Sequence, residues 1–504
     1  MDTELSGQRG RKGQFVPRLL FMVGVVFLTP LLMLLPFAQD RRWQCVLSFF
    51  LPAGLMFLSG AAVFVWQRKR GSIRLPGRQQ AVVTVMLLWL YVMVVGALPF
   101  LVGGQLRAIP ALLESVSGWT TTGFTVLPDI DHTPHIFLFY RGFMQFCGGL
   151  GFVLILLLFA GGREATKLFT AEGHSDMLEP NVRGTARKTM YIYLGMVSGG
   201  TLLYIIFGMP WFEAVNHSMS ALGTGGFSPR AENIGVYDSL PLEIVTMLLM
   251  LLGATNFAAL SQVLKGKWRS FFKMGEVRFF SLLLIGFILL IAVLGKTRGV
   301  YDGFGESLRN AAFLAISAVS TTGYSIDSFA DWVPSMLMLI FVLMFIGGAS
   351  GSTAGGIKYT RLYVLIRAFL EHLRAKFRPE RAVSLVTVQG IAGKIRLSEP
   401  SLAQHQRVAL IYLATFFFGS FLLSLDPGIP GMEDAMLEFA SSLSTTGLSN
   451  YTVAGASNYV MLIQTISMVF ARMEVYMVYV FLWAGLGKLK TVGAERGARN
   501  SGER

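Results

Sequence analysis

Long runs of apolar residues recur along the whole chain. We predict ten membrane-spanning segments from them, at 18–36, 44–66, 81–103, 136–160, 187–208, 240–264, 277–297, 334–357, 406–425 and 457–487. Each run is long enough to cross a hydrocarbon core of roughly 30 Å as a helix. A helix satisfies its own backbone hydrogen bonds in lipid, so the pattern predicts an all-α integral membrane protein.

The composition supports this prediction. The chain has 504 residues, of which 53% are hydrophobic and 14% charged, and its mean hydropathy is +0.57. A soluble chain would carry about a quarter charged residues. No small-residue cleavage pattern follows the first apolar run, so we interpret it as a retained helix. The two cysteines, Cys45 and Cys147, suggest neither a disulfide framework nor a zinc site.

The net charge of +14 reflects topology, and we expect no nucleic acid partner. An even number of crossings places both termini on one side, and that side holds 34 of the 43 Lys and Arg residues. Eight lie on the other side, and Arg472 lies within a span. Cytoplasmic loops are enriched in Lys and Arg, so we expect a multi-pass inner-membrane protein with both termini in the cytoplasm.

Acidic residues favour the opposite, outer side. They include Asp129, Asp131, Asp302, Asp327 and Glu433. An acidic outer vestibule would raise the local concentration of an incoming cation. The alternative is that these acids simply populate external loops.

A short phrase recurs four times between the predicted spans. The copies read GWTTTGFTVLPD (118–129), ALGTGGFSPRAE (221–232), AVSTTGYSIDSF (318–329) and SLSTTGLSNYTV (442–453). Each copy follows an amphipathic stretch that is too short to span a bilayer and precedes another full apolar run. The repeated unit is therefore a span, a short pore helix, a re-entrant loop and a second span.

The repeats divide the chain into five regions. An N-terminal tail with two extra transmembrane helices occupies 1–80, and the four repeats occupy 81–186, 187–276, 277–405 and 406–504. The third repeat includes the basic cytoplasmic segment 358–407, and the fourth ends in a cytoplasmic tail. The basic segment could lie on anionic membrane lipid or dock a soluble partner.

The repeated loops have the chemistry of a potassium filter. Irregular backbone at membrane depth must be buried or line a wet cavity, so four such loops indicate one shared pore. The C-terminal end of a pore helix favours a cation, and loop carbonyls can replace the hydration shell of potassium. Glycine supplies backbone angles that other residues resist. The predicted filter residues are Thr121, Thr122, Gly123, Thr224, Gly225, Gly226, Thr321, Thr322, Gly323, Thr445, Thr446 and Gly447.

The second span of every repeat is interrupted 24 to 27 residues after its filter glycine. The interruptions are GGLG (148–151), GATN (253–256), GGASGSTAGG (347–356) and ARMEVY (471–476). A continuous helix from Pro334 to Glu371 would be about 57 Å long, far more than a bilayer needs. We therefore predict an intramembrane gate loop, the alternative being close helix packing through small residues. Its predicted gate residues are Gly347, Gly348, Gly351, Gly355 and Gly356.

Arg472 lies in the last span at the depth of this loop. A charged residue inside a membrane is costly, and it indicates a functional site. A fixed positive charge below a cation filter would raise the barrier to permeation and could form part of the gate. The alternative is a structural ion pair with Glu474.

Together these motifs resemble the Trk/Ktr/HKT superfamily of potassium transporters, and its bacterial Trk branch most of all. The resemblance covers about 81–488 and includes RGFMQFCGGLGFVLILLL (141–158), ATNFAALSQVLKGKW (254–268), GGASGSTAGGIKYTR (347–361) and FARMEVYMVYVF (470–481). It implies that the four loops form the filter, that 347–356 is the gate and that Arg472 is a barrier residue. It also implies a homodimer with one pore per chain, and a cytosolic regulatory subunit that binds nucleotides.

The filter pattern favours potassium. All four filter positions hold glycine, whereas members of the superfamily with serine at the first position tend to pass sodium. Two residues depart from the pattern, since Gly225 replaces a threonine and Leu448 replaces an aromatic residue. These departures would weaken discrimination against sodium.

A gated, channel-like pathway for potassium uptake is the favoured function, with the potassium ion as the transported species. The alternative is a secondary transporter that couples potassium entry to proton or sodium movement. That mechanism would need His or carboxylate relays in the membrane, and we place His132, His135 and His217 outside, with Glu474 as the only acid clearly within a span. An enzyme would need clustered His, Asp or Glu residues, which the sequence lacks, and a scaffold would not repeat a filter phrase.

Overall fold

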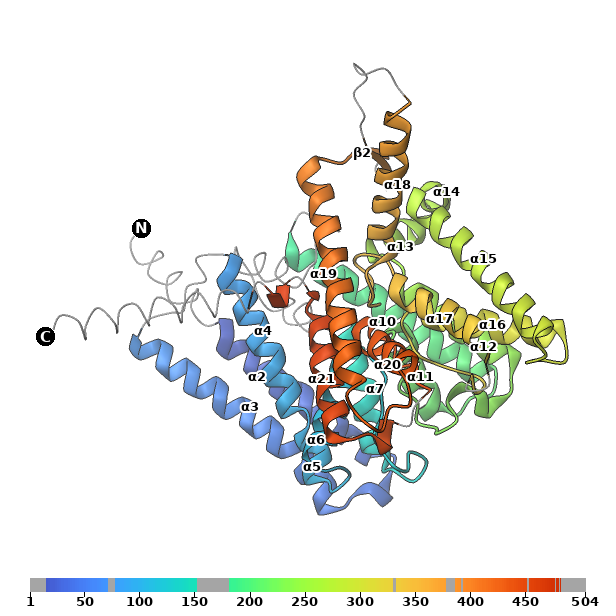
Figure 1. Cartoon of the computed structure of the whole chain (residues 1–504). Coiled ribbons are helices and arrows are strands. Elements are labelled where there is room, and N and C mark those ends of the chain that lie inside the picture. Colours follow the sequence, from blue (N-terminus) through green and yellow to red (C-terminus); the bar gives the residue numbers. More distant parts are fainter. Residues whose placement is uncertain are drawn as a thin grey trace, which may run out of the picture.

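The computed structural model describes residues 15–70, 78–151, 181–329, 332–377, 386–390, 393–450, 453–475, 477–479 and 481. Most of these residues are helical, and the two described strands form one short antiparallel pair, β1 (Thr387–Gly390) with β2 (Gly393–Arg396). Figure 1 shows α2 and α3 (blue) on one flank of the bundle and α15 on the opposite flank. The predicted all-α membrane architecture is confirmed.

The two extra N-terminal helices form a pair. They are α2 (Phe15–Leu28), which continues as the 3-10 turn η1 (Thr29–Leu34), and α3 (Trp43–Arg70), with η2 (Ala38–Asp40) between them. Gly24 allows them to approach closely, because an added Cβ there would collide with the Phe57 ring. This pair lies outside the four repeats that follow.

Each repeat contains a long first helix, a short pore helix and a second helix. The first helices are α4 (Arg78–Val95) with α5 (Leu98–Val102), α10 (Val182–Ile206), α15 (Gly275–Thr297) and α19 (Glu399–Leu423). The pore helices are α6 (Ala108–Thr120), α11 (Trp211–Leu222), α16 (Phe304–Val319) and α20 (Met432–Ser444). The second helices are α7 (His135–Leu150), α12 (Leu240–Gly253), α17 (Pro334–Ile346) and α21 (Asn458–Arg472).

The remaining elements are shorter or lie beyond the second helices. They are η3 (Asn233–Tyr237), α13 (Phe257–Leu264), α14 (Trp268–Lys273), α18 (Tyr359–Ala375) and η4 (Val453–Gly455). In Figure 1, α18 stands beside the first half of α19 and projects beyond the body of the bundle. The basic segment predicted at 358–407 thus begins as a helix and a strand pair that leave the bundle core.

The described part of the chain has six helices long and apolar enough to cross a membrane, or seven if α12 and α13 count as one bent span. Long side chains on α15 are largely exposed, such as Leu282 (73%) and Ile285 (55%). Burying such side chains in lipid is favourable, whereas water would leave the whole helix face hydrated. The chain is a membrane protein with several spanning helices.

The second span of each repeat ends as a helix before its predicted end, at Leu150, Gly253, Ile346 and Arg472. The span predicted at 240–264 bends by 113° between α12 and α13, and Asn256 caps the second part by accepting hydrogen bonds from the amides of Ala258 and Ala259. The span predicted at 334–357 ends as a helix at Ile346. A glycine-rich sequence costs a helix stability at every position, so the helix stops where the glycines begin.

The four pore helices form a ring at the centre of the bundle. Each pore helix packs against the second helix of its own repeat: α6 on α7, α11 on α12, α16 on α17 and α20 on α21. Each also packs against the second helix of the preceding repeat, and the ring is closed where α6 contacts α21. The fourth repeat is therefore a neighbour of the first, as a single central pore requires.

Candidate ion filter and gate

All four pore helices end in the same backbone turn. The first threonine after each pore helix adopts a left-handed conformation. Its φ is 59° at Thr121, 51° at Thr224, 54° at Thr321 and 57° at Thr445. This threonine lies two residues before the filter glycine and reverses the direction of the chain. The amide of the residue that follows it donates to a serine carbonyl in the pore helix. These bonds join Thr122 to Ser117, Gly225 to Ser220, Thr322 to Ser317 and Thr446 to Ser441, each at 2.9 Å. The turn has the form of a Schellman cap, and it sends four equivalent loops away from four helix ends.

The four filter glycines form a closed ring. A Cβ added to each would come within 3.0 Å of a carbonyl oxygen of the next loop, closer than real Cβ atoms approach. The pairs are Gly123 with Gly225, Gly226 with Thr322, Gly323 with Thr446 and Gly447 with Thr122. All four glycines also have positive φ, from 80° to 99°. Glycine is therefore required both for the backbone angle and for the close approach of neighbouring loops.

A cavity of about 390 Å³ lies on the side of the ring where the loops lead away from the pore helices. All four filter glycines line it, together with Arg141 and Arg230. The structure thus brings together the four loops that the sequence places far apart, around one shared space.

Two of the acids predicted for the outer vestibule interact with basic side chains. The carboxylate of Asp129 lies 2.8 Å from Nδ1 of His132, and this hydrogen bond lowers the pKa of Asp129. The carboxylate of Asp131 lies 3.7 Å from Arg230, which also pairs with Glu213 at 2.8 Å. The loop surface near these residues therefore carries both acidic and basic side chains.

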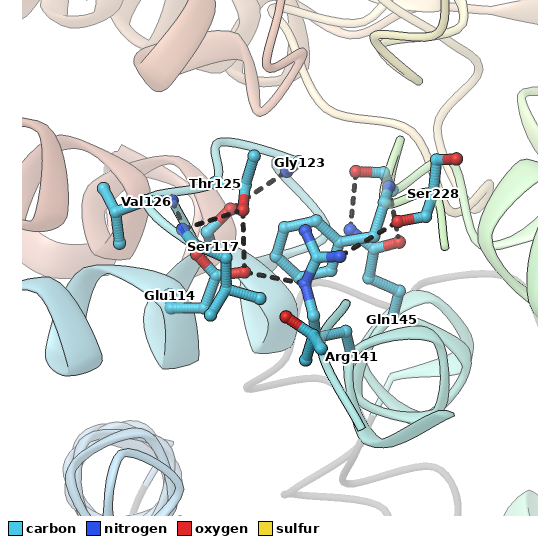
Figure 2. Close-up of polar contacts among 12 residues, drawn as sticks. Glu114, Ser117, Gly123, Thr125, Val126, Arg141, Gln145 and Ser228 are labelled. Atoms are coloured by element: carbon cyan, nitrogen blue, oxygen red, sulfur yellow. Dashed lines mark hydrogen bonds and ion pairs between the residues drawn. The ribbon is translucent and has the colours of Figure 1, made fainter. Parts of the chain in front are cut away.

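A buried ion pair connects the first filter loop to the second. Arg141 on α7 and Glu114 on α6 are 1% and 0% exposed, and Nε of Arg141 lies 2.7 Å from the carboxylate. Glu114 also accepts hydrogen bonds from the Thr125 hydroxyl (3.1 Å) and the Val126 amide (2.8 Å), while Arg141 donates to the Ser228 carbonyl (2.9 Å). Figure 2 shows this network between the two loops. A fully bonded buried pair of this kind fixes the positions of both chain segments.

Gln145 holds the second loop from one turn further along α7. Its side-chain nitrogen donates to the Gly225 carbonyl at 2.6 Å. Its side-chain oxygen accepts from the Ser220 hydroxyl (2.7 Å) and the Phe227 amide (3.1 Å), as Figure 2 shows in part. The second loop is thus bonded to the helix of the first repeat on both sides of Gly226.

Several polar residues occupy places that the sequence analysis did not predict. His217, predicted to lie outside, is buried on α11 at 0% exposure, and Arg141 is buried on α7 at 1% exposure. Acids other than Glu474 are buried among the described helices, including Glu114 and Glu438 in pore helices and Glu243 in α12. The sequence signal that could have revealed these buried residues is an ionisable side chain within an otherwise apolar segment. Among the described residues no group of three or more His, Cys, Asp or Glu could hold a metal ion, and Cys45 and Cys147 are free thiols.

The loop 347–356 lies against the other side of the filter. The Gly355 amide donates to the Thr321 hydroxyl at 2.7 Å, and the Thr353 hydroxyl lies 3.2 Å from that of Thr224. Thr353 also donates to the carbonyls of Leu222 (3.0 Å) and Gly253 (2.9 Å). The predicted gate loop therefore contacts the ends of the second and third pore helices directly.

Close glycine contacts hold this loop in a compact form. A Cβ added to Gly347 would collide with the backbone of Gly355 and Gly356, and one added to Gly355 would collide with the Ser444 carbonyl. Gly348 lies against Ala354. Larger residues at these places would push the loop away from the fourth pore helix.

The break between α12 and α13 forms the seat of this loop. The Ala349 amide donates to the Ala254 carbonyl (2.8 Å), and the Thr353 amide donates to the Gly253 carbonyl (3.1 Å). The Asn256 side chain donates to the Ser350 carbonyl at 2.6 Å. Carbonyls freed by the end of α12 thus find partners in the loop, which satisfies both segments at membrane depth.

Arg472 lies at the end of α21, beside the loop. Its guanidinium donates to the Gly148 carbonyl and lies 5.4 Å from the centre of the Trp89 ring. The Glu474 carboxylate, considered as a partner of Arg472, lies 2.7 Å from Arg361. Arg472 and Lys358 line a cavity of about 90 Å³ with residues of the gate loop, on the side opposite the vestibule.

Comparisons with known proteins agree with this geometry. A family model described as TrkH, a cation transport protein, matches residues 48–484. The Trk system potassium uptake protein TrkH of Halomonas elongata is 31% identical over 381 residues, which cover 73% of this chain and 77% of that protein. The Trk system potassium uptake protein TrkG of Escherichia coli is 29% identical over 485 residues, covering 91% and 96%.

A solved structure has the same fold. The crystal structure of the potassium transporter TrkH from Vibrio parahaemolyticus superposes with a TM-score of 0.80 at 26% sequence identity, and the match covers 94% of this chain and 98% of that one. The family model and the identity to a curated relative extend over most of the chain. The chain belongs to the TrkH family of cation transport proteins.

Proposed function

We propose that this protein carries out potassium uptake across a bacterial inner membrane, through one gated, channel-like pore in each chain. The membrane-spanning helices and the membership of the TrkH family support the transport of a cation. The relatives named above are potassium uptake proteins, which favours potassium as the substrate. The chain would act as a transporter and not as an enzyme.

The closed ring of filter glycines is the observation that carries this proposal. Each glycine lies against a carbonyl of the next loop, so the four loops enclose one axis with no side chain between them. Backbone carbonyls in such a ring can replace the hydration shell of potassium. The helix ends behind the loops add a partial negative charge that favours a cation. The proposed filter consists of the twelve threonine and glycine residues predicted from the sequence.

We assign gating to the loop 347–356 and Arg472. The loop lies directly beneath the filter on its inner side, where Gly355 and Thr353 contact the ends of three pore helices. Arg472 adds a positive charge at the same depth. An ion leaving the filter would meet both, so the loop must move for conduction. We further propose a homodimer that is surrounded by lipid and regulated by a cytosolic nucleotide-binding subunit, with both termini in the cytoplasm.

Coupled transport is the second mechanism to test. Buried carboxylates at Glu114 and Glu438 are the kind of group that a proton relay would use. Glu114, however, pairs with Arg141 and Glu438 accepts from Gln464 at 3.2 Å, which favours structural roles. Passive conduction through the filter is therefore the favoured mechanism.

The experiment is rubidium uptake into liposomes that contain only the purified protein. Potassium and sodium are added as competitors, with and without a proton gradient. We expect potassium to compete far better than sodium without any gradient. Uptake that requires a proton or sodium gradient would replace conduction by coupled transport. Equal competition by sodium would contradict the potassium filter.

A further inference from the structure

The residue nine positions before each filter glycine lies at an equivalent place on its pore helix. In three of the four repeats it forms a hydrogen bond to the filter loop. These residues are Glu114, His217, Leu314 and Glu438, one on each pore helix. All four are at most 5% exposed. They differ in type, so they share no sequence motif, and only the structure shows that they occupy one equivalent place.

In three repeats this residue bonds to the hydroxyl two positions after the filter glycine. Thr125 donates to Glu114 at 3.1 Å, and Ser449 donates to Glu438. In the second repeat, Nε2 of His217 lies 3.1 Å from the Ser228 hydroxyl. We name these three contacts the loop struts.

The histidine takes the same role as the two carboxylates. Its Nδ1 lies 2.9 Å from the Glu213 carbonyl, which only accepts, so Nδ1 carries the proton. In the neutral ring Nε2 is then an acceptor, and the Ser228 hydroxyl donates to it. Each strut thus runs from a loop hydroxyl to a buried acceptor on the pore helix behind the loop.

The third repeat has no such strut. Ser325 stands two positions after Gly323, as the other hydroxyls do, but Leu314 offers it no acceptor. The same loop is the one whose Thr321 hydroxyl accepts a hydrogen bond from the gate loop at Gly355, 2.7 Å away. The gate loop also contacts the second loop, where the Thr353 hydroxyl lies 3.2 Å from that of Thr224, so the third loop differs from the second in having the gate contact without a strut.

We propose that Glu114, His217 and Glu438 are positioning residues for selectivity, which fix three filter loops to their pore helices, while the third loop has no strut and adjusts with the gate. This inference rests on the proposed filter function. Discrimination between potassium and sodium depends on where the filter carbonyls are held, and a buried hydrogen bond within one loop limits their movement. Loss of a strut should lower selectivity while the fold and the pore persist.

Ser449→Ala and Ser325→Ala form a matched pair for the test. Both change a serine to alanine at the same distance from a filter glycine, but only Ser449 belongs to a strut. Purified variants are reconstituted, and rubidium uptake is measured against competing potassium and sodium. We expect the preference for potassium over sodium to fall about threefold to tenfold in Ser449→Ala, the worth of one hydrogen bond. The preference of Ser325→Ala should match the wild type.

Substitutions of Glu438 provide the second test, with folding followed by size-exclusion chromatography. Glu438→Leu copies the third repeat and should lower the preference for potassium. Glu438→Gln keeps an acceptor for Ser449 and should restore most of it, which a purely structural loss would not do. An unchanged preference in Ser449→Ala, or an equal loss in Ser325→Ala, would overturn the loop struts. A wild type with no preference for potassium would instead overturn the filter function itself.

Discussion

The two halves of the proposed pore, the outer half with the filter loops and the inner half with the gate loop, are built in opposite ways. On the outer side, four loops repeat the same turn, and four glycines repeat the same contact around a ring. On the inner side, the four second helices end in four different ways: at Gly151, at a bend of 113°, at a glycine-rich loop and at Arg472. The repeats agree where the ion would be bound and differ where its passage would be controlled.

The difference reflects the separate structural requirements of ion binding and gating. Replacing a hydration shell requires ligands on all sides of the ion, so four equivalent loops suit the outer half. A gate needs one part that moves against fixed neighbours, so a single loop seated on the break between α12 and α13 suits the inner half. The following changes are expected to separate these two roles.

Gly323→Ala should have the largest effect. Its φ of 82° resists a side chain, and the added Cβ would collide with the Thr446 carbonyl, so we expect uptake to be lost. Rubidium uptake into liposomes checks this. Gly286→Ala is the control, because no atom lies within 4 Å of a Cβ added there. Normal uptake by Gly323→Ala would contradict the ring.

Arg141→Met should destabilise the outer half. It leaves Glu114 buried without its charged partner, which costs about 3–5 kcal/mol. Thermal unfolding of the purified protein should show a clearly lowered midpoint, whereas Arg298→Met at the exposed end of α15 should not. The double variant Glu114→Leu with Arg141→Met should recover part of the loss. A midpoint equal to the wild type would mean that the pair does not hold the loops.

Arg472→Ala should raise basal flux. It removes a positive charge and a hydrogen bond to Gly148 beside the gate loop, so we expect uptake without any partner to rise roughly tenfold, as for a barrier lowered by about 1.4 kcal/mol. Lys273→Ala, an exposed cation at the end of α14, is the control. Unchanged or lower flux in folded protein would exclude the barrier role.

Thr353→Val should have the smallest effect. It keeps the shape of the side chain but removes the hydroxyl that bonds to Leu222 and Gly253, so the closed loop is weakened by roughly 1 kcal/mol. Basal flux should rise a few fold while the preference for potassium stays constant. Thr353→Ser retains the hydroxyl and should behave as the wild type. A changed ion preference would mean that this loop also shapes the filter.

The sequence predicts the outer half better than the inner half. The four proposed filter loops can be recognised in the sequence because a local turn and a required glycine leave the same letters four times, as at Gly123 and Gly447. The loop proposed as the gate can be recognised because five glycines cannot continue a helix. The sequence predicts the interruption at 253–256 but not its bend of 113°, since Asn256 within an apolar run shows its capping role only in the folded chain.

The buried polar contacts could not be predicted for a different reason. Arg141 and Glu114 are separated by 27 residues, and neither residue alone identifies its partner in the sequence. The position nine residues before the filter glycine holds a glutamate in two repeats, a histidine in one and a leucine in one. No sequence pattern therefore marks the loop struts. Such residues are recognised only from the atoms that they contact in the folded chain.

The ion preference of Gly123→Ser tests the central claim most directly. This glycine faces the Gly225 carbonyl, so a serine there should displace the loop. Because superfamily members with serine at this position tend to pass sodium, we expect a conducting but distorted ring. The measurement is the sodium-to-potassium permeability ratio in planar bilayers, from reversal potentials with one cation on each side. The account predicts a ratio well above that of the wild type. An unaltered ratio in a conducting protein would contradict the assignment of the four glycines as the filter.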